Sequence, residues 1–353
     1  MKRSLAALLT ACLALALPST GAWAQPKPRQ NCASVTPETC NVAHALGRGV
    51  NLGNMLDAPR EGDWGSKLGP AFIDKAAASF STVRLPVRWS NHAAPTADAT
   101  IDEGFARRVD GIVDALLAKG VYVILDLHHY TQLSGDAQHP NEFAVDASVA
   151  EPRLLNLWRQ IAARYKDRPP KLLFELFNEP HGKLNGEAWN TLAARTLAVV
   201  RQTNPNRIVL IGPGEWNGIP ELPKLRLPAD RNIIVSIHNY DPFNFTHQGV
   251  DYLPQHFPVG TPCCDAAQRK QIADALEAAR RWNQASGYPV HLGEFGTSDE
   301  TDVASRANYA RVARDEAEKR GIGWAYWNFV PPFGLYQPKT GTWIEPIRKA
   351  LLD

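Results

Sequence analysis

The sequence has no excess of charge of one sign and, after its first residues, no long hydrophobic run. Its 353 residues contain 38 Lys and Arg against 36 Asp and Glu. Beyond residue 17, no stretch approaches the roughly 20 apolar residues of a transmembrane helix. Nucleic acids and anionic membranes both attract proteins with a basic excess, so neither is an expected partner.

The chain also lacks a Ser/Gly-rich linker, a low-complexity tract, a phosphate-binding glycine turn and a serine elbow. GVNLGNML at 49–56 has the wrong glycine spacing for a dinucleotide site. GPGEW at 213–217 contains no serine. We therefore expect one domain without a nucleotide cofactor or a serine nucleophile.

The N-terminus has the pattern of a secretory signal peptide. Lys2 and Arg3 precede an apolar run over 5–17, and small residues stand at Ala22 and Ala24. We predict cleavage after Ala24 and secretion to the periplasm or outside the cell. Removal of residues 1–24 leaves 36 basic and 36 acidic residues. The alternative, a lipoprotein box ending at Cys12, is disfavoured because the apolar run continues past it.

Four cysteines remain after this processing: Cys32, Cys40, Cys263 and Cys264. Export to an oxidising compartment makes disulfides possible. Cys32 and Cys40 are close enough to clip residues 25–45, which we interpret as a leader segment before a main domain at 46–353. A bond between the neighbours Cys263 and Cys264 needs a strained peptide unit, so the state of that pair is left open.

Apolar runs typical of buried strands alternate with helical patterns along the rest of the chain. The strand-like runs are 49–53, 82–87, 121–127, 171–177, 207–212, 232–238, 289–295 and 323–329. The clearest helical patterns are 105–118, 149–166, 187–203, 265–286 and 304–320, with a final helix at 343–352. Residues 213–231 hold many prolines and predict only a short helical turn. Eight such units predict an α/β fold, a single-domain (β/α)8 TIM barrel.

Polar or aromatic groups follow strand after strand. They are Asn51 and Asn54, Arg84, Asp126 with His128 and His129, Asn178 and Glu179, His238 with Asn239 and Tyr240, Glu294, and Trp327 with Asn328. In a barrel the carboxyl ends of all strands meet at one face, where active sites of this fold lie. Glu179 and Glu294 are the two reactive groups of the set. Enzymes that cleave glycosidic bonds use such a pair of carboxyl groups, one to give a proton and one to attack or to activate water.

The motifs around these two residues resemble glycoside hydrolase family 5. FELFNEP (174–180) matches the family's acid/base motif, and LGEFG (292–296) matches its nucleophile motif. The family's other site positions fall on Arg84, His128, Asn178, His238, Tyr240 and Trp327. The similarity runs from about residue 48 to the C-terminus and is strongest to a branch of endoglucanases, some of which also cut mannan. That branch often has Glu where this chain has Asp57, and its Cys263–Cys264 region differs.

The resemblance implies a retaining endo-β-1,4-glucanase that works by double displacement. Glu294 would attack the anomeric carbon, kept ionised by Arg84 and Tyr240, and Glu179 would be the acid/base. Asn178 would bind the sugar 2-hydroxyl. His128 and His238 would orient substrate or glutamates, and Trp327 would form a floor for the sugar.

Further candidate substrate contacts are His129, Trp216, Asn54, Asp57 and His247. For the last three, solvated polar residues of a loop are an equal alternative. Glu175 lies on the same strand face as Glu179, and we interpret it as a buried, hydrogen-bonded structural carboxylate.

Three alternatives stay open. β-1,4-Mannanase or xyloglucanase activity, alone or with glucanase activity, would use the same site. A metal-dependent barrel hydrolase would use Asp126, His128, His129 and His238. A non-catalytic carbohydrate-binding protein is disfavoured because both glutamates are present. We expect a monomer acting on a β-1,4-linked polysaccharide or oligosaccharide, with no cofactor and no metal.

Overall fold

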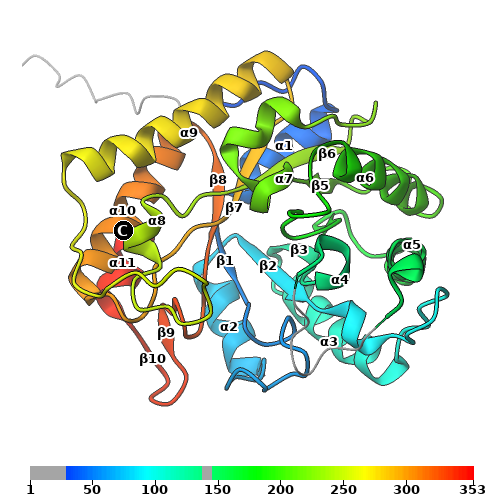
Figure 1. Cartoon of the computed structure of the whole chain (residues 1–353), viewed down its shortest axis with the longest axis horizontal. Helices are drawn as coiled ribbons and strands as arrows, with labels where there is room; N and C mark the ends of the chain where they lie inside the picture. The colour runs from blue at the N-terminus through cyan, green and yellow to red at the C-terminus, as the bar shows by residue number, and fades with distance from the viewer. Residues whose placement is uncertain (1–28, 137–144) are drawn as a thin grey trace, which may run out of the picture.

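The computed structural model describes residues 29–136 and 145–353. Eight parallel strands form a closed barrel in which each strand pairs with the next and β8 pairs with β1 (Figure 1). They are β1 (Arg48–Asn51), β2 (Thr82–Val87), β3 (Tyr122–Leu127), β4 (Leu172–Glu175), β5 (Val209–Ile211), β6 (Ile233–His238), β7 (Val290–Glu294) and β8 (Gly323–Tyr326). Each lies within one of the apolar runs or overlaps it closely. The predicted (β/α)8 barrel is confirmed.

Helices connect the strands around the outside of the barrel (Figure 1). The long ones are α2 (Pro70–Ser79), α3 (Glu103–Ala118), α5 (Ala147–Arg164), α6 (Gly186–Arg201), α9 (Ala266–Ser286), α10 (Val303–Glu318) and α11 (Glu345–Leu352). The connection after β5 holds only α7 (Gly214–Asn217) and the 3-10 helix η2 (Ile219–Lys224), as its prolines predict. Shorter elements are η1 (Trp89–His92), α4 (Thr131–Ser134), α8 (Phe243–Thr246) and a hairpin of β9 (Tyr336–Gln337) and β10 (Thr342–Trp343).

Aspartate caps explain where several of these helices begin. Asp102 accepts a hydrogen bond from the Phe105 amide at the start of α3, and Asp302 accepts one from the Ser305 amide at the start of α10. Such caps satisfy backbone donors that have no partner inside the helix.

The segment before β1 closes the amino end of the barrel. It forms helix α1 (Pro37–Leu46), on which Val42 and Leu46 pack in one apolar cluster with Ile124, Leu173 and Leu210. These three residues stand on β3, β4 and β5, each before the last residue of its strand. The described part of the predicted leader segment is therefore packed against the barrel. The domain boundaries themselves stay a prediction, and the predicted signal peptide at 1–24 lies outside the described residues.

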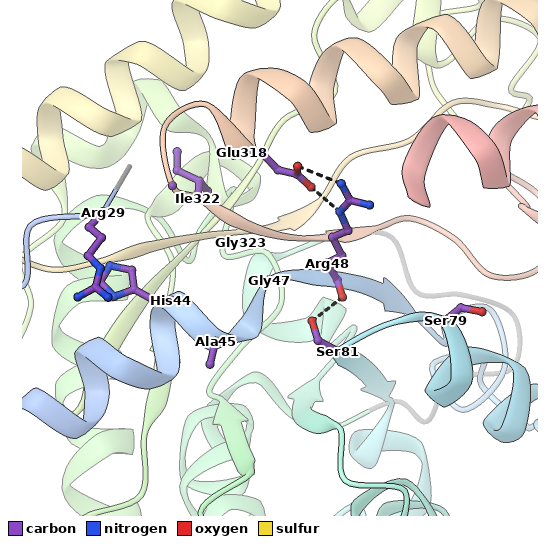
Figure 2. A pocket seen from close by; sticks show the side chains of 11 residues that line it. Arg29, His44, Ala45, Gly47, Arg48, Ser79, Ser81, Glu318, Ile322 and Gly323 are labelled. Carbon is purple, nitrogen blue, oxygen red and sulfur yellow. Dashed lines mark hydrogen bonds and ion pairs between the residues drawn. The ribbon is translucent and has the colours of Figure 1, made fainter. Parts of the chain in front are cut away.

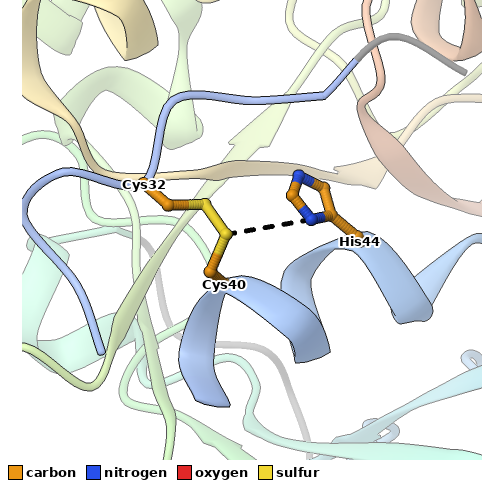
Figure 3. Close-up of side chains that lie close together, drawn as sticks. All are labelled: Cys32, Cys40 and His44. Atoms are coloured by element: carbon orange, nitrogen blue, oxygen red, sulfur yellow. Dashed lines mark hydrogen bonds between the residues drawn. A yellow bond between two sulfur atoms is a disulfide. The ribbon is translucent and has the colours of Figure 1, made fainter. Parts of the chain in front are cut away.

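Disulfides join both pairs of cysteines that the sequence singled out. Cys32 is bonded to Cys40, as expected, and the link ties the chain before α1 to the helix beside His44 (Figure 3). Cys263 and Cys264, whose state was left open, are bonded to each other.

A cavity of about 920 Å³ lies beside α1 at the amino end of the barrel (Figure 2). Arg48 in its wall is paired with Glu318, with 2.7 Å between Nε and Oε1. The Ser81 hydroxyl donates to the Arg48 carbonyl at 2.9 Å. These wall groups bond to one another, and the cavity is at the end opposite the carboxyl ends of the strands.

None of the helices within 29–136 and 145–353 combines the length and apolar character that crossing a membrane requires.

Candidate active site

The carboxyl ends of the strands bring the predicted polar ring together inside the mouth of the barrel. Glu294 is the last residue of β7, and Glu179 follows β4 by four residues. The Asn178 amide donates to the Leu127 carbonyl at 3.0 Å, which keeps the NEP turn beside β3. One carboxylate oxygen of Glu179, one of Glu294 and one ring nitrogen of His238 all lie within 4.8 Å of one another.

Glu294 is held at both oxygens. Nη1 of Arg84 donates to Oε1 at 2.7 Å, and the Tyr240 hydroxyl donates to Oε2 at 2.8 Å. Burial raises the pKa of Glu294 to about 7, and the charge of Glu179 adds to this, whereas His238, Arg84 and Tyr240 lower it. The predicted contacts are present, but in the free protein burial outweighs them.

Among the described residues, the carboxyl of Glu179 has one side-chain hydrogen-bond partner: Nδ1 of His238 lies 2.6 Å from its Oε1. Burial raises the pKa of Glu179 to about 7, with smaller contributions from Asp126 and Glu175. Burial also lowers the pKa of His238 to about 4, which keeps this imidazole neutral near neutral pH. We assign the Nδ1–H tautomer to His238, so that it donates to Glu179.

Arg84 is the fully buried hub of the site. Its donors reach Glu175 (2.7 Å), Asn51 (3.0 Å), Glu294 (2.7 Å) and the Asn178 side-chain oxygen (2.6 Å). Glu175 also accepts from the Ser236 hydroxyl at 2.7 Å. Glu175 is thus a buried, hydrogen-bonded carboxylate, as interpreted from the sequence.

The ring of Trp327 is stacked parallel to that of His128, at 5.5 Å between centroids and 4° between planes. Gly53 permits this position, since a Cβ there would lie 2.5 Å from the indole ring. The ring of His129 makes T-shaped contacts with two other rings, at 4.3 Å between centroids for His128 and 5.8 Å for Trp64.

Two more of the predicted contacts lie in the loop after β1. Asp57 is fully buried, and its carboxylate accepts from the amides of Asn54 (2.9 Å) and Met55 (2.8 Å). Burial raises its pKa to about 6. Its carboxylate therefore supports the loop after β1. Asn54 reaches the Pro331 carbonyl at 3.2 Å. Sugar contacts by these two side chains stay predictions.

Trp216 and His247 each belong to a stacked pair at the rim of the site. Trp216 is 50% exposed and stacks on His181, with 4.6 Å between ring centroids. His247 is buried and stacks on Phe243 at 4.0 Å. The exposed rings of the two pairs, Trp216 and Phe243, suit the apolar faces of pyranose rings.

The metal-site alternative was built on Asp126, His128, His129 and His238. Within the described residues these four do not form one ligand set. His128 and His129 converge with Asp57, and His238 converges with the two glutamates. Within the described residues, the four proposed metal ligands are therefore divided: His128 and His129 lie in one group, His238 lies in the other, and Asp126 belongs to neither.

Two side chains near the pair were not predicted. Asn217 bonds to the Asn178 carbonyl (2.5 Å) and to Nε2 of His238 (3.4 Å), in a turn where three consecutive non-glycine residues have positive φ. Tyr252 is 63% exposed, yet partial burial and the charges of Glu179 and Glu294 raise its pKa. Neither stands at a strand end, so the pattern that identified the other residues could not find them.

Comparison with known proteins agrees with this geometry. The family model described as Cellulase (glycosyl hydrolase family 5) matches residues 45–331. Endoglucanase H of Acetivibrio thermocellus is 33% identical over 94% of this chain. The chain spans 35% of that relative's length.

Two solved structures of Thermotoga maritima Cel5A are also similar to this chain. The complex with mannotriose is 37% identical with a TM-score of 0.83, covering 88% of this chain and 99% of that one. The complex with cellobiose is 38% identical with a TM-score of 0.82, covering 88% and 99%. The match to the family model extends over most of the barrel, and the chain belongs to glycoside hydrolase family 5.

Proposed function

We propose that this protein is a secreted, monomeric endo-β-1,4-glucanase that cleaves internal glycosidic bonds with retention of configuration and without a cofactor. The observation that carries the proposal is the Glu179–Glu294 pair, whose oxygens approach within 4.8 Å. Carboxyls about 5–5.5 Å apart are typical of retaining enzymes, whereas inverting enzymes need about 6.5–9.5 Å for a water molecule. The separation supports direct attack by a carboxylate.

Glu294 is the nucleophile in this proposal. Of the pair, it gives up the first proton, because a cation and a hydroxyl donate to it, whereas His238 is the one side-chain donor to Glu179 among the described residues. Its carboxylate electron pair attacks the anomeric carbon while the bond to the leaving oxygen breaks. The product is a glycosyl ester on Glu294.

Glu179 supplies the proton that the leaving oxygen takes up. The negative charge of Glu294 raises the pKa of Glu179, because two neighbouring carboxylates repel each other. Esterification of Glu294 removes that charge and so lowers the pKa of Glu179. Glu179 can then accept a proton from water, which attacks the anomeric carbon and releases Glu294. His238, neutral and bonded to Glu179, orients it through both steps.

Asn178 is suited to recognise the 2-hydroxyl of the sugar under attack. Its side-chain oxygen accepts from Nη2 of Arg84 at 2.6 Å, which leaves the amide N–H groups to donate. A hydrogen bond to the 2-hydroxyl strengthens as positive charge develops on the sugar. Trp327 would carry the adjacent ring face.

β-1,4-Mannanase activity is the second candidate, with xyloglucanase as a further variant. Glucose and mannose differ in the orientation of the 2-hydroxyl, the group assigned to Asn178. The similar Cel5A structures contain cellobiose in one case and mannotriose in another. This observation favours testing both series of substrate.

The test is product analysis on matched cello- and manno-oligosaccharides, with Glu294→Gln as the control and with enzyme treated with a chelator. We expect cleavage of internal cello-oligosaccharide bonds that the substitution abolishes and the chelator does not change. Cleavage of both series would make the specificity broad. Loss of activity on chelation, with recovery on adding zinc, would favour a metal-dependent hydrolase instead. N-terminal sequencing of exported protein tests the proposed cleavage after Ala24.

A further inference from the structure

The mechanism leaves one buried acid of the catalytic cluster without a role. Asp126 is the penultimate residue of β3, and its side chain is fully buried. Its Oδ2 lies 2.5 Å from Nδ1 of His128 and 3.1 Å from Nη2 of Arg84. Among the described residues, no hydrogen-bond donor reaches its Oδ1. Burying a carboxyl with one oxygen unpaired destabilises a fold, so packing alone does not explain Asp126.

Arg84 has one N–H group left for Asp126. Four of its five N–H groups already donate to other side chains, namely Glu175, Asn51, Glu294 and Asn178. Two of those acceptors are carboxylates, so a third acid adds repulsion within the cluster. The charge of Asp126 contributes to raising the pKa of Glu175 and of Glu179. The partner that distinguishes Asp126 from the other acids is His128.

His128 is a neutral imidazole in this setting. Burial lowers its pKa well below the usual value, and the charges of Arg84 and Arg88 act in the same direction. A neutral ring carries one proton, on the nitrogen whose neighbour can accept it. At Nδ1 that neighbour is Asp126. Burial raises the pKa of Asp126 to about 7 and the charge of Arg84 lowers it. In its ionised form the carboxylate accepts from Nδ1–H through Oδ2, 2.5 Å away. Nε2, on the opposite side of the ring, is then left as an acceptor.

We propose that Asp126 is a positioning residue of the active site, which acts through His128. By accepting from Nδ1–H it holds the ring parallel to Trp327 and leaves Nε2 to accept a hydrogen bond from a hydroxyl of the substrate. This proposal rests on the proposed glycosidase function. It adds a residue of β3 that contacts no substrate itself.

The test is the tautomer of His128, read from its ring-nitrogen chemical shifts in protein labelled with ¹⁵N-histidine. The chain has ten histidines, and the signals that disappear in His128→Gln identify this ring. We expect the Nδ1–H form in the wild type. Asp126→Asn keeps the shape but can either accept or donate, so we expect a mixture of tautomers. We expect kcat/KM to fall about 10- to 100-fold, as for other partners that orient functional histidines.

Glu175→Gln is the matched control, because it also removes a buried carboxylate from Arg84 but does not contact His128. It should keep the wild-type tautomer. In the background of His128→Gln, Asp126→Asn should cause little further loss of kcat/KM. An Nε2–H tautomer in the wild type overturns the proposal whether or not the variants fold, and so does an unchanged tautomer in Asp126→Asn. If the wild type cleaves neither series of oligosaccharides, the proposed function fails, but the tautomers still decide the role of Asp126.

Discussion

Replacing Tyr240 by phenylalanine removes one of the two donors that hold Glu294 ionised. The Tyr240 hydroxyl donates to Oε2 at 2.8 Å, and Arg84 holds the other oxygen. A hydrogen bond to a charged group contributes about 1.5–3 kcal/mol, and one pKa unit corresponds to about 1.36 kcal/mol. Loss of the bond therefore raises the pKa of Glu294 by about 1 to 2 pH units from its value of about 7.

As the proposed nucleophile, Glu294 must be ionised to react, so this change should move the acid limb of the kcat/KM profile to higher pH by the same amount. On that limb Tyr240→Phe should lose about 10- to 100-fold in kcat/KM. The assay is the pH dependence of kcat/KM on an aryl β-cellobioside. Its leaving group departs without a proton, so the assay reports mainly on Glu294.

Tyr288→Phe is the matched control, because the Tyr288 hydroxyl donates to the Asp230 carbonyl at 3.2 Å and not to the catalytic pair. It should leave the acid limb where it is. An acid limb that stays in place in Tyr240→Phe would show that this hydroxyl does not stabilise the charge of Glu294. The role given to the contact would then be wrong.

Three further changes probe the rest of the structure. The ionised form of Glu179 destabilises the folded protein, because its folded pKa of about 7 exceeds its unfolded value of about 4.5. Glu179→Gln should therefore raise the free energy of unfolding by up to about 3 kcal/mol above pH 7 and by little near pH 5. Urea unfolding at the two pH values measures the difference. Gly53→Ala should lower kcat/KM about 10- to 100-fold, because the added Cβ would displace the ring of Trp327; steady-state kinetics on cello-oligosaccharides measures it. Replacing Cys32 and Cys40 by serine should lower the free energy of unfolding by about 2–3 kcal/mol, since the disulfide closes a short loop; urea unfolding measures it.

Each of these expectations has a control and a result that contradicts it. Gly69→Ala adds a Cβ with no atom within 4 Å and should leave kcat/KM unchanged; an equal loss in both glycine variants would remove Trp327 from the explanation. Equal stability changes for Glu179→Gln at the two pH values would mean that ionisation is not the cause. For the disulfide, the wild type and the double-serine variant should unfold alike when both are under reducing conditions, which also open Cys263–Cys264.

The order of strands and the residues at their ends could be predicted from the sequence. Runs such as TVRLPV at 82–87 are continuously apolar apart from one charged residue, which is how a strand covered on both faces reads. Once eight such runs are assigned to a barrel, Glu179 and Glu294 must lie at the same face, because parallel strands all end there. This prediction needs only the local pattern of each run and the rule that the carboxyl ends of parallel strands meet at one face.

Only the tertiary structure decided how these residues share protons. Arg84 meets Glu175, Glu294, Asn51 and Asn178 because the barrel places side chains from β1, β4, β7 and the turn after β4 around one guanidinium. The raised pKa of Glu294 follows from burial, which depends on every element that excludes water from the site. The same holds for residues away from strand ends, such as Asn217, since their position comes from a loop conformation. Sequence pattern determines which groups line the mouth of the barrel, whereas distance and desolvation, which determine what each group does, exist only once the barrel has closed.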